Sequence, residues 1–246
     1  MKVLSERRAL VTGGSRGIGA AIVRRLAADG AEVAFTYFRL RGSGRPAAVG
    51  NIRTGRYGGA DQADSADAQQ VSAAVDEAVS QLGGLDILVN NAGVSSSGNV
   101  ESFPLEQFDR MLAINVRAVF VAIQHAIPYL GTGGRVITTG SIFADHTLRP
   151  GSAVYAMTKA AVAGLTRGLA RELGPRGITV NVIQPGPTAT GANPDTGEFA
   201  EAMRARTAVG HYGRPQDIAS AVAYLARPEA GFITGISWNV DGGFAA

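Results

Sequence analysis

The fold is decided by the stretch Arg8-Ala-Leu-Val-Thr-Gly-Gly-Ser-Arg-Gly-Ile-Gly19, near the start of a chain of 246 residues. A short apolar strand runs into a glycine-rich turn, and a second apolar strand spans 32–37. Between them lies an amphipathic helix, whose apolar face carries Ile18, Ile22, Val23 and Leu26. This order is typical of a dinucleotide-binding unit, because glycine lets backbone amides at a helix N-terminus approach a pyrophosphate.

The rest of the chain continues to alternate between strands and helices. Apolar runs predict further strands at 85–90, 135–139, 178–183 and 236–240. Helical spacing predicts helices at 67–82, 104–130, 152–173 and 215–226, with a short helix at 198–206 inside a mobile loop at 188–212. We therefore predict an α/β fold, with one domain over 1–246 and a doubly wound parallel sheet of Rossmann type with about seven strands flanked by helices.

One segment does not fit this pattern. No acidic residue occurs from Val33 to Ala60, and 40–60 is rich in arginine and glycine. A parallel sheet needs a crossover helix and a third strand here, but the sequence shows no helical spacing after Leu40 and no clean strand before Asp61. Two interpretations remain: a long basic excursion, or a stretch whose sequence no longer matches its fold, for example through a local change of reading frame.

Composition excludes several classes of function. The net charge of +3 argues against binding of nucleic acid or of a membrane. The chain has no cysteine, which excludes disulfides, thiolate catalysis and cysteine-based zinc sites. Its three histidines, at 125, 146 and 211, lack the spacing of metal ligands, so no metal is expected. No signal peptide or membrane span is recognisable, so a soluble cytoplasmic protein is expected.

The stretch Tyr155-Ala-Met-Thr-Lys159 is the strongest candidate for chemistry. Lys2 and Lys159 are the only lysines among 23 basic residues. A spacing of four places the phenol and the ammonium on one face of a helix. The ammonium can then lower the pKa of the phenol and make it a general acid or base. The alternative is an exposed helix face with a solvated lysine and a partly buried tyrosine.

Charge near the second strand indicates which dinucleotide is bound. NAD sites usually place an acidic residue at the end of this strand to hold the ribose 2′-hydroxyl. Here Tyr37 stands at that position, Arg39 follows it, and Arg16 lies in the glycine turn. Two arginines without a carboxylate favour a 2′-phosphate, so NADP(H) is predicted over NAD(H), unless both arginines are merely solvated.

Taken together, the motifs resemble those of the short-chain dehydrogenase/reductase family, and most of all its bacterial 3-oxoacyl-(acyl carrier protein) reductase branch. The resemblance spans nearly the whole chain outside 40–60, in family order. It is carried by Thr12-Gly-x-x-x-Gly-Ile-Gly19, Asn90-Asn-Ala-Gly93, Asn115, Ser141, Tyr155-x-x-x-Lys159, Pro185-Gly186 and Asn239-Val-Asp-Gly-Gly243.

The resemblance implies a role for each matching residue. Tyr155 would donate a proton to a carbonyl, Lys159 would tune Tyr155 and hold the nicotinamide ribose, and Ser141 would orient the carbonyl. Asn115 would hold a water that relays protons to Lys159. Besides Tyr155 and Lys159, the implied cofactor residues are Gly13, Ser15, Arg16, Gly17, Ile18, Gly19, Arg39, Asp64, Ser65, Asn91, Ala92, Gly93, Pro185, Gly186, Thr188 and Thr190.

Three functions are compatible with these residues. The first is an NADPH-dependent reductase of a 3-oxoacyl thioester or similar ketone, free or attached to a carrier protein. The second is an alcohol or sugar dehydrogenase of the same family that works oxidatively. The third, of another class, is a nicotinamide-binding sensor without turnover. The long helices at 104–130 and 152–173 are assembly surfaces in the family, which implies a homotetramer or a dimer.

Overall fold

Seven parallel strands form one sheet, in the order β3-β2-β1-β4-β5-β6-β7. The computed structural model describes residues 2–38, 57–147 and 149–246. Its strands are β1 (Arg8–Val11), β2 (Glu32–Tyr37), β3 (Tyr57–Gln62), β4 (Ile87–Asn90), β5 (Arg135–Thr139), β6 (Thr179–Pro185) and β7 (Ser237–Val240). The predicted α/β class is confirmed. The strand order reverses between β1 and β4, which is where doubly wound sheets open a ligand crevice at their carboxyl edge.

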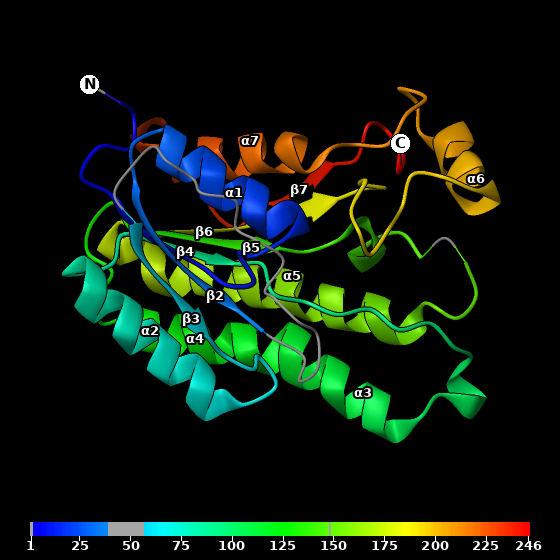
Figure 1. Cartoon of the computed structure of the whole chain (residues 1–246), viewed down its shortest axis with the longest axis horizontal. Coiled ribbons are helices and arrows are strands. Elements are labelled where there is room, and N and C mark those ends of the chain that lie inside the picture. The colour runs from blue at the N-terminus through cyan, green and yellow to red at the C-terminus, as the bar shows by residue number, and fades with distance from the viewer. Residues whose placement is uncertain (1, 39–56, 148) are drawn as a thin grey trace.

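Helices cover both faces of the sheet (Figure 1). One face is covered by α1 (Gly17–Ala28) and α7 (Pro215–Ala226), and the other by α2 (Ala68–Leu82), α4 (Ala118–Ala126) and α5 (Ala153–Leu173). Two further helices, α3 (Leu105–Leu112) and α6 (Glu198–Arg206), lie toward the ends of the strands. Among the helices of the described ranges, none is long and apolar enough to cross a membrane.

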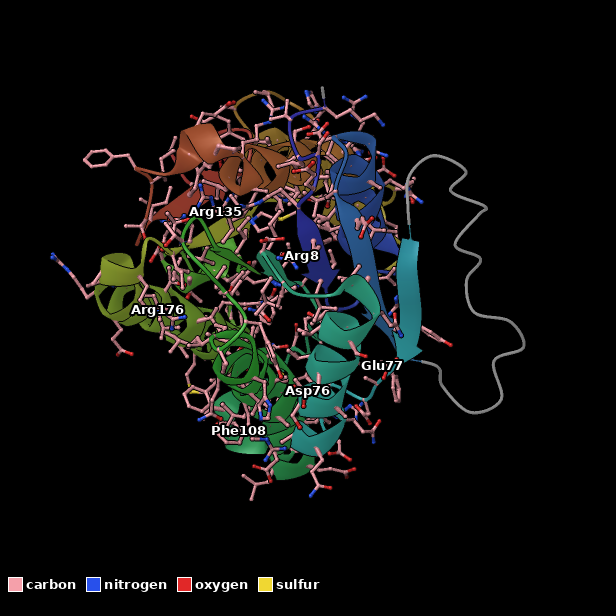
Figure 2. The ribbon with its side chains drawn as sticks, turned by 90° about the vertical axis from the view of Figure 1, so that its left-hand side faces the viewer. Arg8, Asp76, Glu77, Phe108, Arg135 and Arg176 are labelled. Atoms are coloured by element: carbon pink, nitrogen blue, oxygen red, sulfur yellow. The ribbon has the colours of Figure 1, made fainter. Side chains whose placement is uncertain are left out.

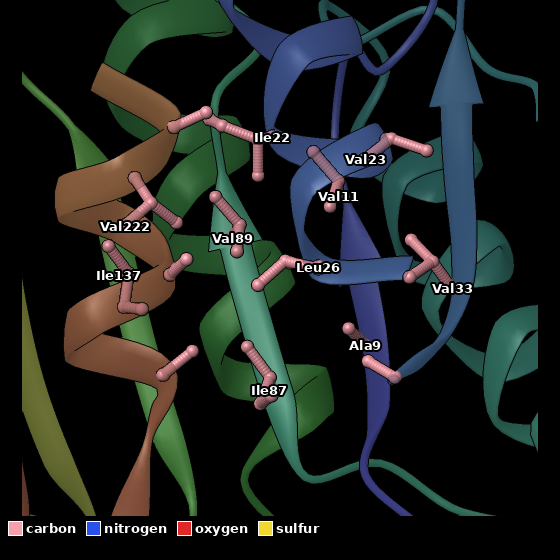
Figure 3. Close-up of a cluster of buried hydrophobic side chains, with 14 of the residues drawn as sticks. Ala9, Val11, Ile22, Val23, Leu26, Val33, Ile87, Val89, Ile137 and Val222 are labelled. Carbon is pink, nitrogen blue, oxygen red and sulfur yellow. The ribbon is translucent and has the colours of Figure 1, made fainter. Parts of the chain in front are cut away.

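The core between the sheet and the α1–α7 layer is built by alternation along the strands. Val11 and Val89 point to this face, whereas Leu10 and Leu88 point to the other. Leu26 of α1 is fully buried among these side chains, as Figure 3 shows. Burying such a leucine contributes about 1.5–3 kcal/mol to folding. The apolar face predicted for the first helix is therefore what fixes the glycine turn against the sheet.

The third strand corrects the prediction for 40–60. The sequence shows no clean strand before Asp61, yet β3 spans Tyr57–Gln62 and pairs in parallel with β2. An edge strand needs only backbone pairing on one side, and Gly58 and Gly59 contribute no side chains to an apolar pattern. The register between β2 and β3 is irregular at Val33 and Ala34. The rest of the atypical segment, including Arg39, lies outside the described residues.

The long helix predicted at 104–130 is interrupted in its middle. A π-helical turn, Ala113–Arg117, joins α3 to α4 and contains Asn115. A π-turn inserts one extra residue into the helix and commonly marks a functional position. Spacing of apolar residues could not reveal it, because the flanking helices keep their own period. The short helix predicted at 198–206 is confirmed as α6.

Arginines fix the opposite, amino-terminal edge of the sheet. Arg8 pairs with Asp86 through Nε at 2.8 Å and covers the start of β1. Arg135 is buried, and its guanidinium donates to the carbonyls of Gly133 and Gly134. Both arginines are visible in Figure 2. This edge is closed by internal contacts, so the carboxyl edge is the place to look for a site.

Candidate active site

The glycine-rich turn at the end of β1 is held close to neighbouring loops. The N–H of Gly13 donates to Thr36 Oγ1 at 3.2 Å, and the φ of Gly13 is +67°. A Cβ on Gly13 would lie 3.0 Å from the Cα of Ala92, and one on Gly19 would collide with the Gly13 carbonyl. Only glycine fits at these two positions, so the turn can pack directly against the loop after β4 and the first turn of α1.

The N-terminus of α1 is available for an anion. Its N-cap residue, Arg16, makes no side-chain capping hydrogen bond, and its first turn contains no acid. The amides of Gly17 and Ile18 therefore meet no capping side chain, and the helix dipole favours a negative group here. Thr190 lies close to this helix terminus, since its Cγ2 would be 3.5 Å from a Cβ placed on Gly17. Ser15 precedes Arg16 in the same turn.

The loop after β4 is anchored to the glycine turn. The amides of Asn91 and Ala92 both donate to Thr12 Oγ1, at 2.9 and 3.1 Å. The side-chain amide of Asn91 donates to the carbonyls of Thr12 and Gly13. A Cβ on Gly93 would lie 3.4 Å from Asn115 Oδ1 and 3.6 Å from Lys159 Nζ. The cofactor loop and the predicted catalytic residues thus meet at Gly93.

Asn115 joins the π-turn to this loop through its side chain. Its Oδ1 accepts from the N–H of Val94 at 2.9 Å, and its Nδ2 donates to the Val94 carbonyl at 2.8 Å. The same Nδ2 donates to Thr158 Oγ1 at 3.1 Å. Asn115 is 1% exposed, and its buried amide is bonded to three groups: the N–H and the carbonyl of Val94 and the hydroxyl of Thr158. This fully bonded geometry explains a polar residue in the middle of an apolar helix.

Lys159 is buried beside Asn115 and Tyr155. Its side chain is on α5, and Nζ donates to the Thr139 carbonyl at 2.9 Å, at the end of β5. Nζ also lies 5.8 Å from the centroid of the Tyr155 ring. Burial lowers the pKa of Lys159 to about 8. The ammonium is therefore the main form at neutral pH and loses its proton readily above it.

The pKa of Tyr155 differs from the prediction. The sequence suggests that Lys159 lowers it, but burial raises the pKa of Tyr155, and a hydrogen bond with Ser141 opposes this only in part. The ammonium is held by Thr139 and faces the ring, while the apolar surroundings disfavour phenolate. The Phe143 ring adds to these surroundings in an edge-on contact at 5.8 Å. Tyr155 is thus a protonated hydroxyl next to Ser141.

A small pocket lies next to the glycine turn, on the side of Ser65. Thr12, Ser65 and Asn90 line it together with apolar residues of β1, α2 and α4. Asn90 is 3% exposed, and neither its Oδ1 nor its Nδ2 has a partner among the described residues. The cavity has a volume of about 20 Å³, which is enough for one water that would satisfy the Asn90 amide. Asp64 does not line the pocket; its carboxylate accepts from the Ala66 amide and shapes the turn after β3.

The loop after β6 lies at the same carboxyl edge of the sheet. Pro185 ends β6, and a Cβ on Gly186 would lie 2.6 Å from the Cα of Asp241. Thr188 Oγ1 donates to the Gly186 carbonyl at 3.0 Å, and Asn193 Nδ2 donates to the Thr188 carbonyl at 3.1 Å. Thr190 exchanges backbone hydrogen bonds with Asn193. These contacts give the segment a defined shape where the sequence predicts a mobile loop.

Most of the predicted residues lie close together. Sequence reasoning quoted Thr12 and Asn90 within motifs without giving them a role, and it missed Thr36, Thr139 and Asn193. Thr36 Oγ1 holds the glycine turn, and Thr12 Oγ1 holds the loop after β4. The carbonyl of Thr139 holds Lys159. Asn90 lines the small cavity beside the glycine turn, and Asn193 holds the loop after β6. The available signal was position, because the three threonines stand at the carboxyl ends of strands. Arg39, predicted as a phosphate ligand, lies outside the described residues.

Known proteins resemble this chain over its whole length. Residues 13–245 match the family described as Enoyl-(Acyl carrier protein) reductase. A cyclic-di-GMP-binding biofilm dispersal mediator protein of Escherichia coli K12 is 41% identical over 100% of both chains. A 3-oxoacyl-(acyl-carrier-protein) reductase, FabG, of Staphylococcus aureus is 40% identical, over 96% of this chain and 97% of its own. A crystal structure of a short-chain dehydrogenase from Burkholderia cenocepacia in complex with NADP is 50% identical, with a TM-score of 0.94, and the match covers 99% of this chain and 100% of the other.

Proposed function

The chain belongs to the short-chain dehydrogenase/reductase family, and from this premise we propose that it is an NADPH-dependent reductase that converts a ketone to a secondary alcohol. The observation that carries the proposal is the convergence of Ser141, Tyr155 and Lys159 beside Gly93. A phenol whose pKa is raised stays protonated at neutral pH, so it can donate a proton. The similarity to a 3-oxoacyl-(acyl-carrier-protein) reductase supports reduction over the oxidative alternative.

Each residue of the site has a proposed role. NADPH supplies hydride when it is bound, and the protein positions the reacting groups. Ser141 holds the carbonyl oxygen, and Tyr155 donates a proton to that oxygen. Lys159 would hold the nicotinamide ribose and restore the proton of Tyr155, and Asn115 would support the route to solvent from its bonded position beside Val94 and Thr158. Electrostatic stabilisation of the developing alkoxide comes from the Ser141 and Tyr155 hydroxyls.

The residues present fit a bound dinucleotide. The glycine positions that exclude a Cβ flank the N-terminus of α1, which has no side-chain cap. The proposed phosphate ligands are Ser15, Arg16, Gly17, Ile18 and Gly19, and Ser65 would face the adenosine. The nicotinamide half would be bordered by Asn91, Ala92, Gly93, Pro185, Gly186, Thr188 and Thr190.

The preference for NADPH over NADH depends on Arg16 and Arg39 in this proposal. Arg16 is exposed and forms no ion pair within the described residues, so its charge is free for a 2′-phosphate. We expect Arg16→Gln to weaken NADPH binding by about tenfold and to leave NADH binding unchanged. Fluorescence titration measures both, with Arg24→Gln on the exposed face of α1 as the control. Equal losses for NADPH and NADH would contradict the assignment.

The substrate is a 3-oxoacyl thioester or a similar ketone in this proposal. NADPH consumption with an acetoacetyl thioester and with ethyl acetoacetate tests it directly. We expect Tyr155→Phe to lower the rate by about 10²- to 10⁴-fold while NADPH binding persists. Full activity in Tyr155→Phe would remove the catalytic role.

A nucleotide-binding sensor is the second candidate, because the relative in Escherichia coli is named as a cyclic-di-GMP-binding mediator. A sensor has no need of a bonded Ser141–Tyr155 pair beside a buried lysine, which is why the reductase is preferred. Calorimetric titration with cyclic di-GMP separates the two. Tight binding, together with no turnover of any ketone, would favour the sensor.

We further propose that the protein is cytoplasmic and forms a homotetramer or dimer. Phe120 of α4 and Met157 of α5 are 49% and 43% exposed, although both are large and apolar. Helix faces of this kind fit a second copy of the chain. Light scattering after size-exclusion chromatography measures the mass, and a monomer at micromolar concentration would contradict the assembly.

A further inference from the structure

Arg149, at the carboxyl edge of the sheet, has no role in the proposed reaction. Arg149 lies in the segment between Ser141 and Tyr155, which leads from β5 into α5. Its Nη2 donates a hydrogen bond to Ser97 Oγ at 3.3 Å. Its guanidinium carbon lies 5.1 Å from the centroid of the Phe199 ring, on α6. Arg149 therefore links the segments that follow β4, β5 and β6.

These three segments lie on the substrate side of the crevice. They leave the carboxyl ends of β4, β5 and β6, whereas the glycine turn leaves β1. The segments after β4 and β5 are joined by a backbone hydrogen bond from the Gly98 N–H to the Gly151 carbonyl at 2.9 Å. Figure 1 shows α6 beyond the ends of the strands. A substrate whose carbonyl lay at Ser141 and Tyr155, with the cofactor over the glycine turn, would extend toward these segments.

The charge of Arg149 is not neutralised by the contacts it makes. Its two partners are a hydroxyl and an aromatic ring, and both are neutral. Within the described ranges Arg149 forms no ion pair, unlike Arg8, Arg25 and Arg227. A guanidinium has five N–H donors, and the bond to Ser97 uses one. The Phe199 ring orients the guanidinium plane without consuming its donors.

We propose that Arg149 is a specificity-determining residue that selects ketones carrying a carboxylate at the end remote from the carbonyl. This rests on the proposed reductase function and adds the substrate class. A guanidinium edge matches the two oxygens of a carboxylate. No second cation joins Arg149 in the contacts of the described residues, so a singly charged group is favoured over a phosphate dianion.

A purely structural role for Arg149 makes a different prediction. If the side chain only ties α6 to its neighbours, its loss disturbs charged and neutral substrates alike. If it binds the carboxylate, its loss affects only the charged substrates and acts mainly on KM. Matched pairs of an acid and its methyl ester separate the two roles, because the partners of each pair share one carbon chain.

The experiment compares 4-oxopentanoate and 5-oxohexanoate with their methyl esters at saturating NADPH. It uses the full chain and the variants Arg149→Gln, Arg149→Lys and Arg24→Gln. We expect the full chain to prefer the acids. Arg149→Gln should lower kcat/KM for the acids by about ten- to a hundredfold and leave the esters within about twofold. Arg149→Lys should retain part of the preference, and Arg24→Gln all of it.

Two outcomes overturn the proposal. One is an equal loss for acids and esters in Arg149→Gln, and the other is no preference for acids in the full chain. If no ketone is reduced at all, the proposed function fails. Binding of the acid and of its ester then tests the role of Arg149. Saturation-transfer NMR with 5-oxohexanoate and its methyl ester, in the presence of NADP⁺, reports binding without turnover. A preference for the acid that disappears in Arg149→Gln supports the role, and the same signal in both proteins removes it.

Discussion

At the scale of single residues, Lys159 is where folding and function conflict most. The side chain is 6% exposed, and its ammonium donates to a backbone carbonyl without a carboxylate partner within the described residues. Burial lowers its pKa from 10.5 to about 8. The folded chain therefore holds this proton about 3 kcal/mol less favourably than the unfolded chain does. The proposed function accounts for why a lysine is kept there.

The first prediction concerns stability against pH. Because the pKa of Lys159 is lower in the folded state, the unfolded chain binds more protons between about pH 8 and pH 10.5. The contribution of Lys159 to the free energy of unfolding must therefore rise with pH across that window. We expect Lys159→Met to be more stable than the parent at pH 7, and we expect the difference to shrink by about 2 kcal/mol at pH 9.5.

Urea unfolding of both proteins at the two pH values measures this difference. Lys2→Met is the matched control, because Lys2 is exposed. A difference between Lys159→Met and the parent that stays constant with pH would show that the lysine is not buried as a charge.

At the scale of elements, the π-turn is the feature that sequence patterns could not supply. Asn115 is recognisable as an anomaly in an apolar helix, but its three partners lie on other segments. The same limit applies to Thr36 and Thr139, because their roles depend on strand neighbours that only the sheet order brings together. Residues with a local signature, such as Gly13 and Tyr155, were accessible from sequence alone.

The second prediction tests the bonds of Asn115. Asn115→Leu leaves both the N–H and the carbonyl of Val94 without their partner, whereas Thr158→Val removes one bond of the same amide. We expect a loss of about 2–4 kcal/mol for Asn115→Leu and about 1 kcal/mol for Thr158→Val, measured by urea unfolding. Equal losses in the two variants would mean that the Val94 contacts contribute little.

The third prediction tests the anchoring of α1. Leu26 is fully buried, and Leu105 at the start of α3 is 76% exposed, so the same substitution can be compared at both sites. We expect Leu26→Ala to cost about 2–5 kcal/mol of unfolding free energy and Leu105→Ala less than about 0.5 kcal/mol. Because α1 carries the glycine turn, Leu26→Ala should also weaken NADPH binding. Unchanged stability in Leu26→Ala would mean that the cavity is refilled by neighbours.

At the scale of the whole molecule, alternation of strands and helices was enough to predict the fold class, but not its weakest strand. The strands β1, β4, β5 and β6 are buried on both faces, so each appears in the sequence as an apolar run that predicts a strand. The edge strand β3 reads Tyr-Gly-Gly-Ala-Asp-Gln and depends on pairing with β2. Its position could be inferred only because a doubly wound sheet requires a third strand at this point of the chain.

The last prediction follows from the polarity of the sheet. The residues that would meet NADPH lie at the carboxyl edge, in 13–19, 90–93 and 185–190, whereas the amino edge is closed by Arg8 and Arg135. Loop amides exchange with solvent through local opening, so a ligand slows exchange where it binds. We expect NADPH to protect the three carboxyl-edge segments and to leave the loop at 131–134 unchanged, as measured by hydrogen exchange with mass spectrometry. Tyr155→Phe should give the same pattern, since it removes the chemistry and keeps the crevice. Protection centred on 131–134 would place the ligand at the wrong end of the sheet and would overturn the site as a whole.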